Sequence, residues 1–124
     1  MSVKVDLDQL ATTLRDYAYA YLVTVGDDYR AHTVAVDPVF DDSVFDVGGL
    51  SGTTLRNVAQ HEIVTLVWPP REPGGYTLIV DGAGSPTDDG LRVAPSRAVL
   101  HRRAAPGAPT RLGCKDDCMP LETA

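Results

Sequence analysis

Hydrophobic positions near the start of the chain follow a helical period. Leu7, Leu10, Ala11 and Leu14 recur at i, i+3, i+4 and i+7, which is the apolar stripe of an amphipathic helix. From Tyr19 the pattern changes to short runs rich in β-branched and aromatic residues, separated by Gly, Asp and Pro, as is typical of strands joined by turns. The strands predicted from these runs span residues 19–25, 31–40, 43–47, 63–68, 76–84 and 91–103, the last interrupted near Pro95.

This pattern predicts a mainly β fold with short helices, arranged as a six-stranded antiparallel barrel, because many short strands at regular spacing favour a barrel over a parallel sheet. Both faces of the strands are largely apolar, as expected when one face fills the barrel and the other meets helices or a second subunit. The barrel domain is expected to span residues 1–104. The Pro- and Gly-rich residues 105–124 are expected to form a flexible or partner-bound tail.

Length and charge narrow the class of protein. The chain has 124 residues and a formal net charge of -6. Its length predicts one domain, and its acidity argues against a nucleic-acid partner or an anionic membrane surface, since both require a basic patch. No apolar run approaches the roughly 20 residues of a membrane span, and the polar start "MSVKVDLDQLATTL" has no signal-peptide core. We therefore expect a cytoplasmic protein.

Two cysteines, Cys114 and Cys118, lie in "GCKDDCMP" near the C-terminus. Such a pair supplies at most half of a four-ligand zinc site, and no metal site is predicted. The pair is interpreted as two reduced thiols on the tail, because cytosolic thiols usually stay reduced. A redox-labile disulfide and a metal clip are the alternatives.

Familiar catalytic motifs are missing from the sequence. The stretch "GLSGT" lacks the final glycine of a nucleophile elbow, and in "GAGSPT" Pro86 prevents the helix that a dinucleotide-binding fingerprint requires. Paired acids such as Asp88 and Asp89 fall in predicted turns, where they are usually solvated turn formers. If the protein is an enzyme, a cofactor therefore carries the chemistry.

One stretch, "GGLSGTTLRNVAQHEIVTLVWPP", holds the candidate binding chemistry. Residues 51–62 predict a short helix ahead of a buried strand, with Ser51, Thr53 or Thr54 as its N-cap. The same hydroxyls, the close backbone approach that Gly52 permits and the charge of Arg56 suit a phosphate at a helix N-terminus. The stretch is thus either an ordinary capped helix or a phosphate-binding segment.

The order of these elements and three local patterns resemble a known family. The patterns are "YRAHTVAV" in the second predicted strand, Arg56, Asn57 and Val58 in the helix, and "YTLIVDGAG" in a later strand. Over residues 7–103 the chain resembles the pyridoxamine 5′-phosphate oxidase-like split β-barrel family of flavin-binding proteins.

The resemblance implies a homodimer with a cofactor in each of two clefts at the subunit interface. Members of the family bind FMN, the deazaflavin coenzyme of actinobacteria or haem, and some bind no known cofactor. The implied cofactor-binding residues are Ser51, Thr53, Thr54, Arg56 and Asn57 for the phosphate segment, His32, Thr33 and Val34 for the ring, and Trp68 as a cover over the site. Without the resemblance, His32 also fits an ordinary strand residue, and Trp68 a core or dimer anchor.

The predicted function is that of a flavin- or deazaflavin-binding oxidoreductase that transfers hydride between the ring and a small organic acceptor. The alternative is a cofactor-free or haem-binding member of the same fold without enzymatic activity. Thr54 stands where the family usually has a second cation. The substrate-side arginine and histidine of the oxidase are also missing, so pyridoxamine phosphate is not expected as a substrate.

Overall fold

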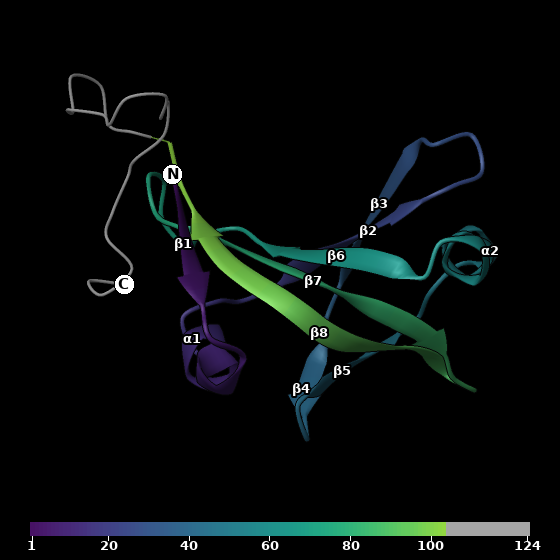
Figure 1. The fold of residues 1–124 in the computed structure, drawn as a ribbon, viewed down its shortest axis with the longest axis horizontal. Helices are drawn as coiled ribbons and strands as arrows, with labels where there is room; N and C mark the ends of the chain where they lie inside the picture. The colour runs from purple at the N-terminus through teal and green to yellow at the C-terminus, as the bar shows by residue number, and fades with distance from the viewer. Residues whose placement is uncertain (104–124) are drawn as a thin grey trace.

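The computed structural model describes residues 1–103, in which eight antiparallel strands form a single curled sheet with short helices at its ends (Figure 1). In chain order the elements are β1 (Ser2–Val5), η1 (Leu7–Gln9), α1 (Leu10–Leu14), β2 (Ala20–Val25), β3 (Ala31–Val36), β4 (Val39–Asp41), β5 (Val44–Gly48), α2 (Gly52–Gln60), β6 (Ile63–Trp68), β7 (Thr77–Pro86) and β8 (Gly90–His101). The strands run in the order β3-β2-β6-β7-β8-β5-β4, and β1 pairs with β8.

The mainly β antiparallel fold is confirmed, but the predicted number of six strands is wrong. The short segment Ser2–Val5, in which Val3 and Val5 alternate with Ser2 and Lys4, forms an additional strand by pairing with the second half of β8. The predicted strand over residues 31–40 is split at Asp37 and Pro38, because proline has no N–H to donate to a ladder.

Pro95 does not interrupt β8, contrary to the prediction. The pairing of β7 with β8 shifts register between Asp81 and Gly82, so that Gly82 pairs with Pro95 and Asp81 with Arg97. This irregularity takes up Ser96 as an extra residue on β8, which lets one strand continue past the proline. The predicted helix over residues 7–14 is also modified, since it begins as the 3-10 segment η1 and becomes α-helical only at Leu10.

The inner face of the sheet holds the hydrophobic core. Phe45 packs between Phe40 and Trp68, with ring centroids 4.6 and 5.3 Å apart. The strands contribute alternate residues to this face, as their period of two requires. The buried strand residues of the core are Val5, Ala20, Leu22, Phe45, Val47, Val64, Leu66, Trp68, Leu78, Val80, Leu91, Val93 and Ala98.

Helix α2 and the β2–β3 hairpin lie together at one end of the sheet, and α1 lies at the other end (Figure 1). Helix α2 packs on β2 and β7. Gly84 of β7 allows this close packing, because a Cβ at that position would lie 3.1 Å from Val58 Cγ1 of the helix. Glycine at position 84 therefore lets α2 lie close against β7.

The predictions for the tail, including the domain boundary near residue 104 and the state of Cys114 and Cys118, lie outside the described residues. Within residues 1–103, none of the helices has the length and apolar character needed to cross a bilayer.

Candidate functional site

The N-terminus of α2 is capped as the sequence predicts. Ser51 is in an extended conformation, and its Oγ accepts a hydrogen bond from the backbone N–H of Thr54 at 3.4 Å. The N–H of Leu55 donates to the carbonyl oxygen of Ser51 at 3.2 Å and starts the helical ladder. The prediction of a capped helix is confirmed, and Ser51 is the cap.

Three side chains around this cap face solvent and carry polar groups. Ser51, Thr53 and Arg56 are exposed, and Arg56 Nη2 donates to Thr53 Oγ1 at 3.2 Å. A Cβ on Gly52 would lie 3.4 Å from Arg56 Nη1, so the guanidinium folds back over the first turn of the helix. We call Ser51, Thr53 and Arg56 the anion segment, since it combines two hydroxyls, a cation and the positive end of a helix.

Thr54 and Asn57 point the opposite way, into the molecule. Thr54 is fully buried, and Asn57 is nearly so. Asn57 Nδ2 donates to the buried Thr24 Oγ1 of β2 at 3.1 Å. Of the residues predicted for the phosphate segment, these two therefore hold α2 against the sheet, and the three residues of the anion segment remain accessible to a ligand.

The ring-binding residues predicted on β3 lie on both faces of that strand. His32 and Val34 pair with Thr24 and Leu22 of β2, and so share the inner face with them, whereas Thr33 lies on the opposite face. His32 Nε2 is inaccessible to solvent and has no hydrogen-bond partner within residues 1–103. The structure thus places His32 and Val34, without Thr33, on the side of β3 that α2 shares.

Trp68 lies inside the core and not over the anion segment. Its side chain is 4% exposed and packs on Phe45 at a centroid distance of 5.3 Å. The structure therefore does not bring Trp68 together with Ser51, Thr53 and Arg56, and its position is that of the core anchor offered as the alternative.

The sequence patterns missed a pair of neighbouring clefts near the end of β5. One cleft, of about 480 Å³, is lined by Tyr19, Ala35, Val36, Asp37 and Gly48. The other, of about 520 Å³, shares Asp37 and Gly48 with the first. The charged residues that line this second cleft are Asp37, Asp46, Asp88, Asp89 and Arg92. Pro38, the Gly48–Gly49 pair and the paired acids Asp88 and Asp89 are sequence features that lie in or next to this region.

The second cleft is lined mainly by acidic residues, whereas the anion segment carries the basic residue Arg56. The cleft is lined by four carboxylates and one guanidinium, and Arg92 Nε pairs with Asp46 Oδ1 at 3.3 Å. Excess negative charge disfavours a phosphate here, so an anionic group is better held at Arg56. In the first cleft, the neighbouring Tyr21 raises the pKa of Tyr19 above its usual value of 10.0. No three potential metal ligands gather anywhere in residues 1–103.

Sequence relatives of the chain come from mycobacteria. No family model matches the sequence. An uncharacterized protein of Mycobacterium bovis and another of Mycobacterium tuberculosis are each 49% identical over 133 aligned positions, which cover 94% of this chain and 94% of the relative.

Solved structures with a similar fold include a reductase and an FAD-binding protein. An F420 reductase superposes with a TM-score of 0.56 at 17% identity, covering 70% of this chain and 93% of its own. The FAD-binding protein of Mycobacterium smegmatis gives 0.59 at 17% identity, covering 82% and 100%. A protein of Bacteroides thetaiotaomicron with a suggested role in 5-nitroimidazole antibiotic resistance gives 0.63 at 6% identity, covering 81% and 86%.

The sequence identities to the solved structures are low, so these superpositions establish only the fold. The 49% identity to the mycobacterial proteins establishes a common family. The chain therefore belongs to the same family as the two mycobacterial proteins, and its fold is the split β-barrel of the pyridoxamine 5′-phosphate oxidase-like proteins.

Proposed function

We propose that this protein is an oxidoreductase that binds FMN or a deazaflavin coenzyme and transfers hydride to a small organic acceptor. The observation that carries the proposal is the Arg56 guanidinium, which lies over the exposed first turn of α2 and donates to Thr53 Oγ1 at 3.2 Å. Support comes from the fold that the chain shares with an F420 reductase and an FAD-binding protein.

The anion segment fits the phosphate of such a cofactor in charge and in donors. The first N–H groups of α2 have no partner within the helix, and Ser51 and Thr53 add hydroxyl donors beside the Arg56 guanidinium. Arginine binds phosphate well because its planar fork offers parallel N–H donors. A single cation here suits one phosphate group better than a diphosphate.

When bound, a flavin or deazaflavin accepts or donates a hydride, and the protein supplies binding, orientation and exclusion of water. In this proposal Ser51, Thr53 and Arg56 hold the phosphate. His32 and Val34, on the face of β3 that α2 shares, orient the ring. The proposal includes a homodimer, since the family resemblance implies that cofactors bind at the subunit interface.

A second candidate is a cofactor-free or haem-binding protein without enzymatic activity. It is favoured by the single cation of the anion segment and by the four carboxylates of the neighbouring cleft. His32 Nε2, which is buried and without a hydrogen-bond partner in residues 1–103, is the nitrogen that a haem iron would use.

Absorption titration of the purified full-length protein separates the candidates. FMN, a deazaflavin coenzyme and haem are added in turn, and the visible spectrum is followed to saturation. Saturable binding of FMN or deazaflavin at micromolar affinity or better is the expected result. A Soret band that is lost in His32→Ala would support the haem-binding candidate, and no binding of any of the three would reject the oxidoreductase.

A further inference from the structure

A third cleft lies where β1 ends beside β8. The pairing of β1 with β8 ends at Val5 opposite Ala98, and the chain then turns at Asp6 into η1, which packs on β8. Residues 4–8 and 96–98 line a cleft of about 710 Å³ here, larger than either cleft near β5. Because α2 lies at the other end of the sheet (Figure 1), this cleft is separate from the anion segment.

Two cations line the strand side of this cleft. Lys4 pairs with Val99 across β1 and β8, and Arg97 precedes Val99 by two residues. Lys4 and Arg97 are therefore diagonal neighbours on one face of the sheet. Both side chains are exposed. Diagonal neighbours of this kind are about 7–8 Å apart, which lets two long side chains reach the same anionic group.

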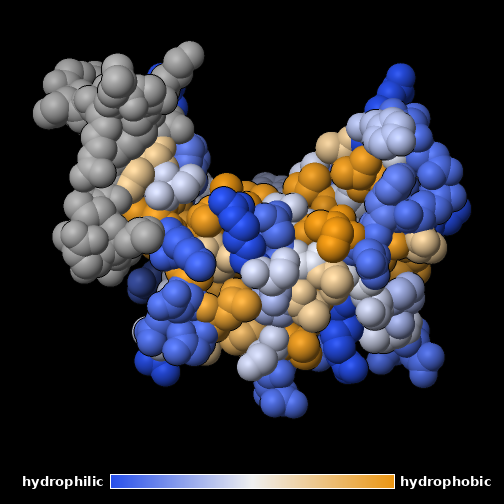
Figure 2. Space-filling model, viewed as in Figure 1, coloured by the Kyte–Doolittle hydropathy of each residue, from blue (hydrophilic) through white to orange (hydrophobic). Residues whose placement is uncertain are grey.

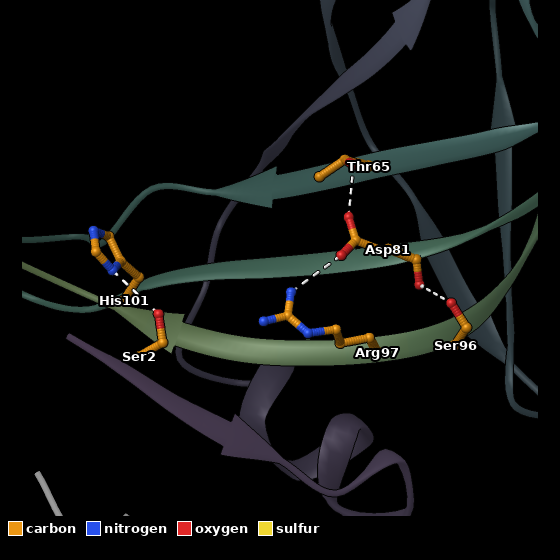
Figure 3. Close-up of polar contacts among 6 residues, drawn as sticks. All are labelled: Ser2, Thr65, Asp81, Ser96, Arg97 and His101. Carbon is orange, nitrogen blue, oxygen red and sulfur yellow. Dashed lines mark hydrogen bonds and ion pairs between the residues drawn. The ribbon is translucent and has the colours of Figure 1, made fainter. Parts of the chain in front are cut away.

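A hydrogen-bonded cluster holds the guanidinium of Arg97 (Figure 3). Arg97 Nη1 donates to Asp81 Oδ2 at 3.3 Å, and Asp81 Oδ1 accepts from Thr65 Oγ1 at 2.7 Å. In this view the Arg97 side chain extends along β8 toward its His101 end, which is the part of β8 that pairs with β1. The contact with Asp81 uses one guanidinium nitrogen, so the other N–H donors of this exposed group remain open to a ligand.

Two acids line the turn side of the cleft. Asp6 and Asp8 are both exposed. In the part of the chain that the structure describes, none of Lys4, Asp6 and Asp8 forms a side-chain hydrogen bond or an ion pair. The four charged side chains of the cleft therefore sum to zero, but the two acids and the two cations do not pair with one another.

Apolar side chains also line the cleft. Val5 and Ala98 are buried, whereas Leu7 is 42% exposed and offers apolar surface that a ligand could remove from water. In the space-filling view, hydrophobic side chains are visible between hydrophilic groups on this side of the sheet (Figure 2). An apolar surface with a few charged groups at defined positions is characteristic of a site for a small molecule.

We infer that this cleft binds a free amino acid with an apolar side chain. The carboxylate of the ligand accepts hydrogen bonds from Lys4 and Arg97. Its ammonium group donates to Asp6 and Asp8, and its side chain covers Leu7. The inference goes beyond the proposed function, since the cleft shares no residue with the anion segment or with the ring-facing residues of β3.

Charge favours a ligand that carries both signs over a ligand with a single charge. A simple anion that binds Lys4 and Arg97 lies beside two carboxylates, in a chain that carries -6 overall. A simple cation that binds Asp6 and Asp8 lies beside the two cations instead. A free amino acid has an ammonium group and a carboxylate next to each other, so it complements both pairs at once.

Isothermal titration calorimetry on the full-length protein without added cofactor tests the inference, with L-leucine as the probe. Saturable binding of one leucine per chain is expected. 4-Methylpentanoate lacks the ammonium group of leucine, and leucinamide lacks its carboxylate. Each of these matched compounds should bind about ten- to a hundredfold more weakly than leucine. Glycine should also bind more weakly, because it has no side chain to cover Leu7.

Substitutions in the cleft test the assignment of its charges. Lys4→Ala and Arg97→Ala should each weaken leucine binding about tenfold or more, and Arg97→Lys, which keeps the cation, should retain more affinity than Arg97→Ala. Asp6→Asn combined with Asp8→Asn should weaken binding by a similar factor. Arg92→Ala is the matched control, because Arg92 also forms a 3.3 Å ion pair, at the other end of β8, and it should leave leucine affinity unchanged.

Three results would overturn the inference: no saturable binding of leucine, equal affinity for leucine and either matched compound, or an equal loss of affinity in the Arg92→Ala control. The outcome is independent of cofactor binding. A protein that binds leucine in this way but binds no flavin would support the inference and reject the proposed oxidoreductase. A protein that binds flavin but not leucine would do the reverse.

Discussion

The core around Trp68 and the contact beneath α2 are both buried, but they are built differently. Around Trp68 the contacts are between rings, with Phe45 at 5.3 Å from Trp68 and at 4.6 Å from Phe40. Beneath α2, the buried contact between helix and sheet includes the hydrogen bond from Asn57 to Thr24. The ring cluster requires only apolar volume, whereas the helix contact also requires a matching donor and acceptor.

This difference indicates which of the two regions requires a precise placement of its elements. Apolar packing tolerates exchange of one shape for another of similar volume. A buried hydrogen bond adds little net stability but is costly to leave half made, so it fixes the placement of α2 more strictly than apolar contacts would. Placement matters most at the end of a helix that is proposed to bind a ligand, and the anion segment lies within the six residues before Asn57.

Replacing Trp68 is expected to have the largest effect on stability. Trp68→Ala removes a large side chain that is 4% exposed, and should lower the free energy of unfolding by about 3–5 kcal/mol. Guanidinium denaturation followed by circular dichroism measures the loss. If Trp68 instead covers the cofactor, the variant would change cofactor affinity by more than it changes stability. Trp68 would then belong to the binding site, and the distinction between the core and the contact beneath α2 would be wrong.

Removing one partner of the hydrogen bond beneath α2 should have an intermediate effect. Asn57→Ala leaves the buried Thr24 hydroxyl without its donor and should cost about 1–3 kcal/mol. Thr24→Val is the shape-matched partner variant. In a double-mutant cycle of urea midpoints, the two changes together should cost less than their sum by about 1 kcal/mol. Strict additivity would show that the contact is not coupled.

Loss of the helix cap should have the smallest effect on stability. Ser51→Ala removes the acceptor of the Thr54 N–H and should cost about 1 kcal/mol, while Ser51→Asp keeps a capping oxygen and should be near neutral in stability. Thermal unfolding monitors both variants. If the anion segment binds phosphate, the added carboxylate of Ser51→Asp should still weaken cofactor binding, because two anions would then share one site. Unchanged affinity in this variant would argue against Ser51 as a phosphate neighbour.

Much of the barrel could be predicted from the sequence, because strands with one buried face carry their period in residue type. The exceptions have local causes. β1 is a short strand with a lysine, and its partner is at the far end of the described chain. The break at Pro38 and the continuity through Pro95 depend on which backbone groups face a neighbouring strand, which residue type does not reveal.

The site was predicted less completely. The sequence predicted a capped helix with Ser51, Thr53 or Thr54 as its N-cap, and the structure identifies Ser51. The inward orientation of Thr54 and Asn57 required knowledge of which side of α2 meets β2 and β7. The separation of Thr33 from His32 and Val34 follows from the period of a strand and could have been anticipated. Trp68 could not be assigned between core and cofactor, since a buried tryptophan is compatible with either.

The most direct test of the central claim is the affinity of FMN and a deazaflavin coenzyme for Arg56→Ala, measured by absorption titration beside wild type. Arg15→Ala, which changes an exposed arginine next to α1, is the matched control. Loss of one charge-assisted contact, at about 1.5–3 kcal/mol, predicts an affinity about ten- to a hundredfold weaker for Arg56→Ala and unchanged for the control. Equal affinities in all three proteins would contradict the assignment of Arg56 as the phosphate-binding cation.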